Sequence, residues 1–185
     1  MRTRSLALAT AGVRFVVYPL LRPWGDASPD GAGAAFASPF WLVAHLAAMA
    51  AFALVGFGLT AVPGRAALAT WIAGTALVLP YYGAEAFALH ALAGEPNVAA
   101  LAEQIRMGAT QLAVFGLGLG LLAAAGVLTA IAMRRAGVVF AAAMVLYLPQ
   151  FFADPAVRIA HGVLLAIGCV ILAARVEERT TVSEG

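Results

Sequence analysis

The sequence predicts an all-α integral membrane protein, a bundle of six transmembrane helices that carries an internal repeat. Apolar residues make up 63% of the 185 residues and charged residues only 11%. The mean hydropathy is +0.94. A water-soluble domain of this length cannot bury so much apolar surface, so the surrounding solvent must be lipid. The apolar residues also gather in stretches of about 20 residues, the length at which a helix crosses a bilayer.

Five of these stretches are long and apolar enough to be transmembrane helices. They cover residues 40–61, 67–87, 108–131, 137–153 and 156–175. The stretch 137–153 is short, and Pro149 near its end predicts a kink there. We therefore expect one transmembrane domain over residues 1–185, ending in a cytoplasmic polar tail at 176–185.

A sixth segment, 5–21, has two interpretations. Arg14 lies near its middle, at a cost of about 2.5–3.5 kcal/mol for insertion. Arg2 and Arg4 before an apolar run also resemble the start of a signal peptide, with Ala35-Phe36-Ala37 as a cleavage site. That site lies far beyond the apolar run, which favours a retained helix; cleavage would leave five helices.

The arginines predict the orientation of the bundle. With six spans, seven arginines fall on the side of the two termini: Arg2, Arg4, Arg65, Arg134, Arg135, Arg175 and Arg179. Only Arg22 and Arg106 fall in the segments on the other side. Because cytoplasmic loops carry the excess of positive charge, both termini are expected in the cytoplasm and the protein in the plasma membrane.

The chain also repeats itself at an offset of 69 residues. Residues 79–85 correspond to 148–154, and Arg65 corresponds to Arg134. The repeated unit is a two-helix hairpin whose two copies run in the same direction. This makes Glu85 and Asp154 pseudo-equivalent carboxylates.

Polar residues concentrate at the extracytoplasmic ends of the predicted helices. His45 and His161 each lie about 8 Å inside a helix, counted by helical rise, and Glu85 closes the helix 67–87 at the same surface. Ionisable groups inside a bilayer are costly and mark functional sites. We therefore predict a ligand or metal site built from His45, Glu85 and His161, surrounded by a second group of residues: Asp154, Arg158, Tyr81, Arg106 and His90.

Some of these residues also have structural explanations. Asp154 precedes Pro155, a pattern typical of a helix N-cap followed by a first-turn proline. Arg158, four residues on, is placed to pair with Asp154. His90 lies close to the surface, and Tyr81 fits an interfacial aromatic belt.

Three functions fit this set of residues. Two imidazoles can bind haem b axially, or bind a transition metal together with a carboxylate. Alternatively, Arg106, Arg158 and Arg14 would hold the anionic group of a small polar or amphipathic ligand, in a lipid-modifying enzyme or a transporter acting as an oligomer. The third is an accessory or structural subunit whose polar cluster only locks helices together.

Further features narrow the possibilities without naming an activity. The chain has no lysine, which excludes Schiff-base chemistry, and its arginines are too scattered for nucleic-acid binding. Cys169, the only cysteine, lies in an apolar run typical of a buried, inert thiol. Gly116 and Gly120 form a small-residue pattern that predicts close helix packing, including packing in a homo-oligomer. No motif is specific enough to assign a family or to decide whether the protein is an enzyme.

Overall fold

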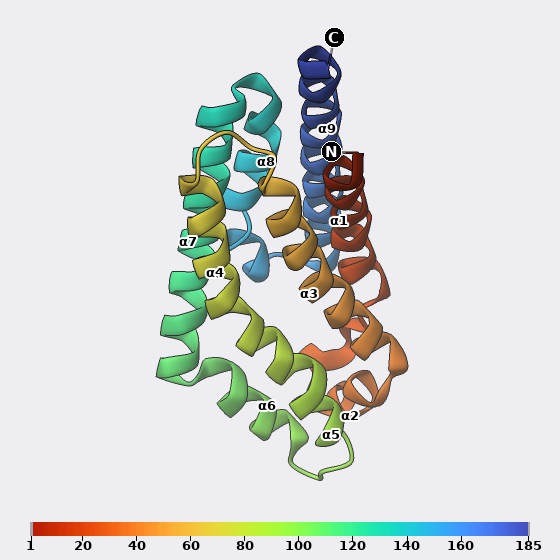
Figure 1. The fold of residues 1–185 in the computed structure, drawn as a ribbon. Coiled ribbons are helices and arrows are strands. Elements are labelled where there is room, and N and C mark those ends of the chain that lie inside the picture. The colour runs from red at the N-terminus through yellow and green to blue at the C-terminus, as the bar shows by residue number, and fades with distance from the viewer. Residues whose placement is uncertain (1, 185) are drawn as a thin grey trace.

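Every regular element in the described part of the chain is a helix (Figure 1). The computed structural model describes the backbone of residues 2–184 and the side chains of residues 2–179. The elements are α1 (Arg2–Leu21), η1 (Trp24–Ala27), α2 (Pro29–Ala37), α3 (Pro39–Leu59), α4 (Ala66–Gly83), the π-helical turn η2 (Ala84–Ala88), α5 (Leu89–Ala91), α6 (Val98–Met107), α7 (Ala109–Met133), α8 (Arg135–Val145), η3 (Pro149–Phe152) and α9 (Pro155–Glu184).

Within the described residues, five helical segments are long and apolar enough to cross a membrane. They are Arg2–Leu21, Pro39–Leu59, Ala66–Ala91, Ala109–Met133 and Pro155–Arg179. The first contains the segment 5–21, which therefore forms a full-length helix in this structure. The last continues as helix to Glu184, so the backbone of the predicted tail is helical up to that residue.

The stretch 137–153 differs from the single span that the sequence predicts. It forms the 11-residue α8, a turn at residues 146–148 and the 3-10 helix η3. Pro149 begins η3, where its missing N–H does not break an α-helical hydrogen bond. At the α-helical rise, α8 is about 16 Å long, roughly half the thickness of a bilayer core.

The longer helices and α8 pack side by side in a ring. Helix α1 packs between α3 and α9, α8 packs between α9 and α7, and α4 packs against α7 and, less extensively, α3. The start of α1 and the C-terminal end of α9 lie at the same end of the bundle, while α2, α5 and α6 gather at the other (Figure 1). We call this second end the distal end.

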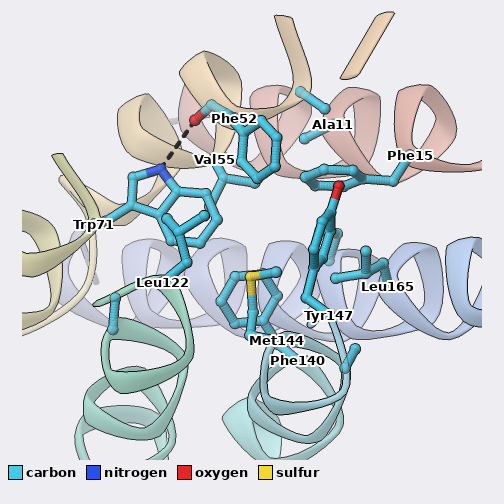
Figure 2. Close-up of a cluster of buried hydrophobic side chains, with 14 of the residues drawn as sticks. Ala11, Phe15, Phe52, Val55, Trp71, Leu122, Phe140, Met144, Tyr147 and Leu165 are labelled. Carbon is cyan, nitrogen blue, oxygen red and sulfur yellow. Dashed lines mark hydrogen bonds between the residues drawn. The ribbon is translucent and has the colours of Figure 1, made fainter. Parts of the chain in front are cut away.

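Aromatic side chains fill the centre of the ring. Figure 2 shows Phe15, Phe52 and Tyr147 converging there, and Trp71 donating a hydrogen bond of 3.0 Å from its indole nitrogen to the carbonyl of Phe52. The Tyr82 and Tyr147 hydroxyls are 2.9 Å apart and share a second buried hydrogen bond. Because lipid tails are as apolar as these side chains, tight packing and buried hydrogen bonds hold the helices together.

Glycines permit the closest helix contacts, but they are not the ones that the sequence pattern singles out. A Cβ atom on Gly118 would lie 2.8 Å from Val78 of α4, and one on Gly168 would lie 2.7 Å from the backbone of Phe140 in α8. Gly116 and Gly120 instead have open space around them. Packing of these two glycines within the chain is therefore absent, and their use in a homo-oligomer stays a prediction.

Candidate functional site

Glu85 is placed by a π-helical turn at the distal end of α4. In this turn the Leu89 N–H donates to the carbonyl of Ala84, five residues back. Such turns alter the regular carbonyl pattern and often lie at functional sites. Here the carbonyl of Glu85 accepts a 2.6 Å hydrogen bond from the indole N–H of Trp41 on α3. The bond ties α3 to α4 at a residue whose side chain is 7% exposed.

The carboxylate of Glu85 forms a bidentate ion pair with Arg106 of α6. The Arg106 Nε donates to Oε1 over 2.6 Å, and Nη2 donates to Oε2 over 2.9 Å. Nη2 also lies 2.9 Å from Asp26 Oδ2, which accepts a further bond from Arg22. Glu85, Arg106, Asp26 and Arg22 thus form one chain of charge-assisted hydrogen bonds, which we call the distal network. It joins three separate segments of the sequence: residues 22–26, η2 and α6.

Both arginines of the distal network are held as cations. Burial by itself would lower the pKa of Arg22, but negative neighbours, Asp26 and Glu85 among them, raise it above its ordinary value. Burial also opposes the charge of Arg106, and the hydrogen bonds and charges of Glu85 and Asp26 again raise the pKa. Two guanidinium groups therefore balance two carboxylates within the network.

His45 lies beside this network in a closed aromatic environment. Its side chain is 1% exposed and contacts the rings of Trp41 and Tyr18. Nδ1 is 2.7 Å from the carbonyl of Trp41 and must carry the proton, because a carbonyl only accepts. Nε2 faces Glu85 Oε2 at 3.7 Å and has no hydrogen-bond partner among the described residues. The structure thus brings together two of the three residues predicted as the site.

His161 lies elsewhere, between α8 and α9. Its Nε2 is 2.8 Å from the carbonyl of Ala143, and its ring packs edge-on against Tyr147 at 5.2 Å. Within the described part of the chain, no three His, Cys, Asp or Glu side chains are grouped to hold a metal ion. His45, Glu85 and His161 therefore do not form one metal centre in this structure. Helical spacing predicts their similar depth, but tertiary packing decides which way each side chain faces.

The remaining predicted residues have separate roles. His90 Nδ1 is 2.6 Å from the carbonyl of Phe36 and connects α5 to α2. Asp154 is exposed, and its carboxylate accepts a 3.1 Å bond from the Val157 N–H, so it is the N-cap of α9 as expected. Its predicted counterpart, Glu85, is buried, and the two carboxylates are not equivalent. Tyr81 stacks on Phe115 with ring centroids 4.1 Å apart.

A cavity of about 600 Å³ lies next to the distal network, within the usual size range of ligand pockets. Its walls come from α1, η1, α4, η2, α6, α7, η3 and α9. The lining contains three arginines and two carboxylates among many aromatic and aliphatic side chains: Tyr18, Arg22, Trp24, Asp26, Ala27, Tyr81, Tyr82, Glu85, Arg106, Met107, Leu112, Phe115, Leu148, Phe151, Phe152, Ala153, Pro155 and Arg158. Arg14, considered above as an anion-binding residue, is not among them and lies on an exposed face of α1.

Arg158 is the cavity arginine outside the distal network. Its Nε donates to Gln150 Oε1 over 3.3 Å, and its guanidinium lies over the rings of Trp24 and Phe151 at 4.8 and 5.1 Å. The Nη2 atom is buried and has no hydrogen-bond partner among the described residues. No described carboxylate pairs with Arg158, since Asp154 caps the helix instead.

The sequence indicates Arg22 only as a loop charge on the extracytoplasmic side, and Asp26 and Trp24 are not among the predicted site residues. In the structure the Trp24 ring lies against Arg22 at 5.0 Å as well as against Arg158. The available signal was the spacing of Arg22 and Asp26, four residues apart with opposite charges directly after an apolar helix.

The five apolar helices of the described residues fit a helical membrane protein, and a buried charged cluster and a ligand-sized cavity lie together at its distal end. Comparison with protein-family models, with curated proteins and with solved structures found no match to this chain.

Proposed function

We propose that this protein is a multi-pass plasma-membrane protein that binds the anionic group of a small ligand in the cavity beside the distal network. The observation that carries the proposal is the unneutralised guanidinium of Arg158 in the wall of a 600 Å³ cavity. Arg22 and Arg106 are neutralised by Asp26 and Glu85. The lining consequently has an excess of one positive charge, which an anion complements.

The distal network keeps this cavity in shape before a ligand arrives. The segments η1, η2 and α6 each supply a wall of the cavity, and the ion pairs between Asp26, Glu85 and Arg106 fix them relative to one another. A wall that is already ordered loses little conformational entropy on binding. The network residues position the site, while Arg158 contacts the ligand.

The proposal includes the orientation given by the positive-inside rule, with both termini in the cytoplasm and the distal end outside. The ends of α1 and α9 share one end of the bundle with the α3–α4 and α7–α8 connections, which carry Arg65 and Arg134 (Figure 1). Because an even number of crossings returns a chain to its starting side, α8 and η3 together would make the sixth, shorter crossing.

Octyl phosphate is a suitable probe, because it carries an anionic group and dissolves in water. Its binding to the detergent-solubilised protein is followed by the fluorescence of Trp24, with Trp24→Phe identifying the part of the signal that comes from this residue. Loss of a charge-assisted hydrogen bond should weaken binding about tenfold in Arg158→Gln. Arg14→Gln removes an arginine outside the cavity and should bind as the wild type does. Equal affinity of Arg158→Gln and wild type would overturn the proposal.

A second candidate function, a structural subunit, has support from the distal network itself. A bidentate pair between η2 and α6 stabilises the distal end whether or not a ligand binds. This reading predicts that wild type and Arg158→Gln respond to octyl phosphate identically, so the same titration separates the two functions.

A further inference from the structure

We propose that the ligand is a membrane amphiphile with a single anionic headgroup, and that it enters the cavity sideways from the outer leaflet, between the start of α7 and η3. This inference rests on the proposed function and adds the class of ligand and its route. Three features carry it: a gap in the helix ring, an apolar rim and one unneutralised cation.

The gap arises because α8 is much shorter than its neighbour α7. At the α-helical rise, the 25 residues of α7 extend about 37 Å and the 11 residues of α8 about 16 Å. Figure 1 shows α7 reaching further toward the distal end than α8. Exposed apolar side chains lie along both halves of α7; in the distal half, Leu112 is 46% and Leu117 61% exposed.

The cavity lies at this gap, and its rim is apolar. Leu112 of α7, Leu148 in the turn after α8 and Phe152 of η3 all line it. Leu148 is 44% exposed and Phe152 is 88% exposed. A pocket that takes its ligand from water needs no exposed aromatic ring at its opening. With α7 spanning the bilayer, this rim lies on a surface that faces the acyl chains.

A second, smaller cavity is placed to bind the acyl chain of the ligand. It has a volume of about 230 Å³ and runs along α4 and α7, lined by Leu77, Pro80 and Val114 among others. It shares Tyr81 and Phe115 with the large cavity, so the stacked pair of rings forms the wall between the two.

The charge of the lining sets the charge of the headgroup. Arg158 is the one cavity cation outside the balanced distal network, and Trp24 and Phe151 flank its guanidinium. A phosphodiester headgroup, with one negative charge, matches this arrangement. A zwitterionic headgroup would bring a second cation beside Arg158 without a described carboxylate free to meet it.

The test compares two lipids in nanodiscs that hold the full chain. Phosphatidylglycerol and phosphatidylcholine, each with brominated acyl chains, are titrated separately into discs of unbrominated phosphatidylcholine. Bromine quenches nearby indoles, and Trp24 lines the cavity while Trp41 and Trp71 are buried in the core. Trp24→Phe therefore removes the signal that belongs to the cavity.

The expected result is saturable quenching of Trp24 by phosphatidylglycerol at about tenfold lower lipid fraction than by phosphatidylcholine. Arg158→Gln should abolish that preference and Arg14→Gln should keep it. Leu112→Glu, which leaves Arg158 in place and adds a negative charge at the rim, should also weaken the quenching by phosphatidylglycerol. Leu112→Glu therefore tests the same prediction if Arg158→Gln does not fold.

Other outcomes separate this inference from the proposed function. If octyl phosphate binds through Arg158 but the two lipids quench Trp24 equally, the ligand is a water-soluble anion; the lipid inference fails and the proposed function stands. If neither octyl phosphate nor phosphatidylglycerol binds through Arg158, both fail.

Discussion

Glu85 and Arg106 meet in a bidentate ion pair that joins the π-helical turn η2 to α6, with N–O distances of 2.6 and 2.9 Å. Both side chains are largely buried, at 7% and 16% exposure. Breaking one partner of such a pair leaves the other charge buried without compensation, which costs more than the intact pair contributes. The pair is therefore the most sensitive point of the distal end.

Glu85→Gln should destabilise the protein by about 3 kcal/mol, the usual cost of breaking a buried pair. The amide of glutamine keeps the size of the side chain but cannot neutralise Arg106. Thermal unfolding in detergent measures the effect, and Glu103→Gln is the matched control because Glu103 lies exposed on the same α6 helix as Arg106. Equal melting temperatures of the two variants would show that the pair does not hold α6 in place.

The stability that Arg106 provides should not depend on pH between 7 and 10. Burial opposes the charge of Arg106, but the neighbouring carboxylates raise its pKa above the ordinary value of an arginine, which itself lies well above pH 10. A cation with a raised pKa in the folded state stabilises the fold fully below its unfolded pKa, and loses this contribution only as the pH rises through the folded value. The pH range from 7 to 10 lies entirely below the pKa of Arg106 in both the folded and the unfolded state.

The measurement is the difference in melting temperature between wild type and Arg106→Gln at pH 7 and at pH 10. The two differences should agree, although each protein by itself can change with pH through its other groups. A difference that disappears by pH 10 would mean that the contribution of Arg106 depends on another group that titrates in this range.

The sequence predicts where each long helix lies along the chain and how deep a residue lies in it, but not which neighbouring helix a side chain faces. Hydropathy and length place five of the long helices, and the Asp154-Pro155 pair gives the start of α9. Depth along a helix is equally readable, and His45 and Glu85, expected at the same surface, lie 3.7 Å apart. The direction in which His161 faces depends on the packing of α8 against α9, and no single-sequence pattern reports it.

The burial of charged residues near the helix ends is the second feature that the sequence does not predict. Arg22 and Asp26 read as solvent-exposed charges beside a helix end, but η1 folds them into the wall of the cavity. Their burial depends on α6 supplying Arg106 from 80 residues further along the chain. Pro149 marks the position where the sequence predicts a kink, but the α-helix already ends at Val145. Proline alone does not explain this end, because Pro80 lies inside the continuous helix α4.

Gly168→Ala should destabilise the bundle, whereas Gly120→Ala should not. A methyl group at residue 168 would lie 2.7 Å from the backbone of Phe140, and a backbone contact cannot be relieved by a rotamer change. The expected cost is about 1–3 kcal/mol, typical of overpacking. Residue 120 has open space around it, so the added methyl group meets nothing within the chain. Thermal unfolding of the two variants in the same detergent gives the comparison.

If Gly120→Ala were the destabilised variant, the cause would have to be a contact between copies of the chain, as the Gly116 and Gly120 pattern predicts.

Cysteine labelling should establish which side of the membrane the cavity faces. The only native cysteine, Cys169, is fully buried, so background labelling in intact cells should be low. Glu95 lies exposed in the loop between α5 and α6 at the distal end, and Ala66 lies exposed at the start of α4 near the other end. A membrane-impermeant maleimide should therefore label Glu95→Cys in intact cells, because the orientation predicted from the arginines places the distal end outside. Ala66→Cys should be labelled only after the cells are opened. The reverse pattern would place the cavity in the cytoplasm, and its ligand would then have to come from the inner leaflet.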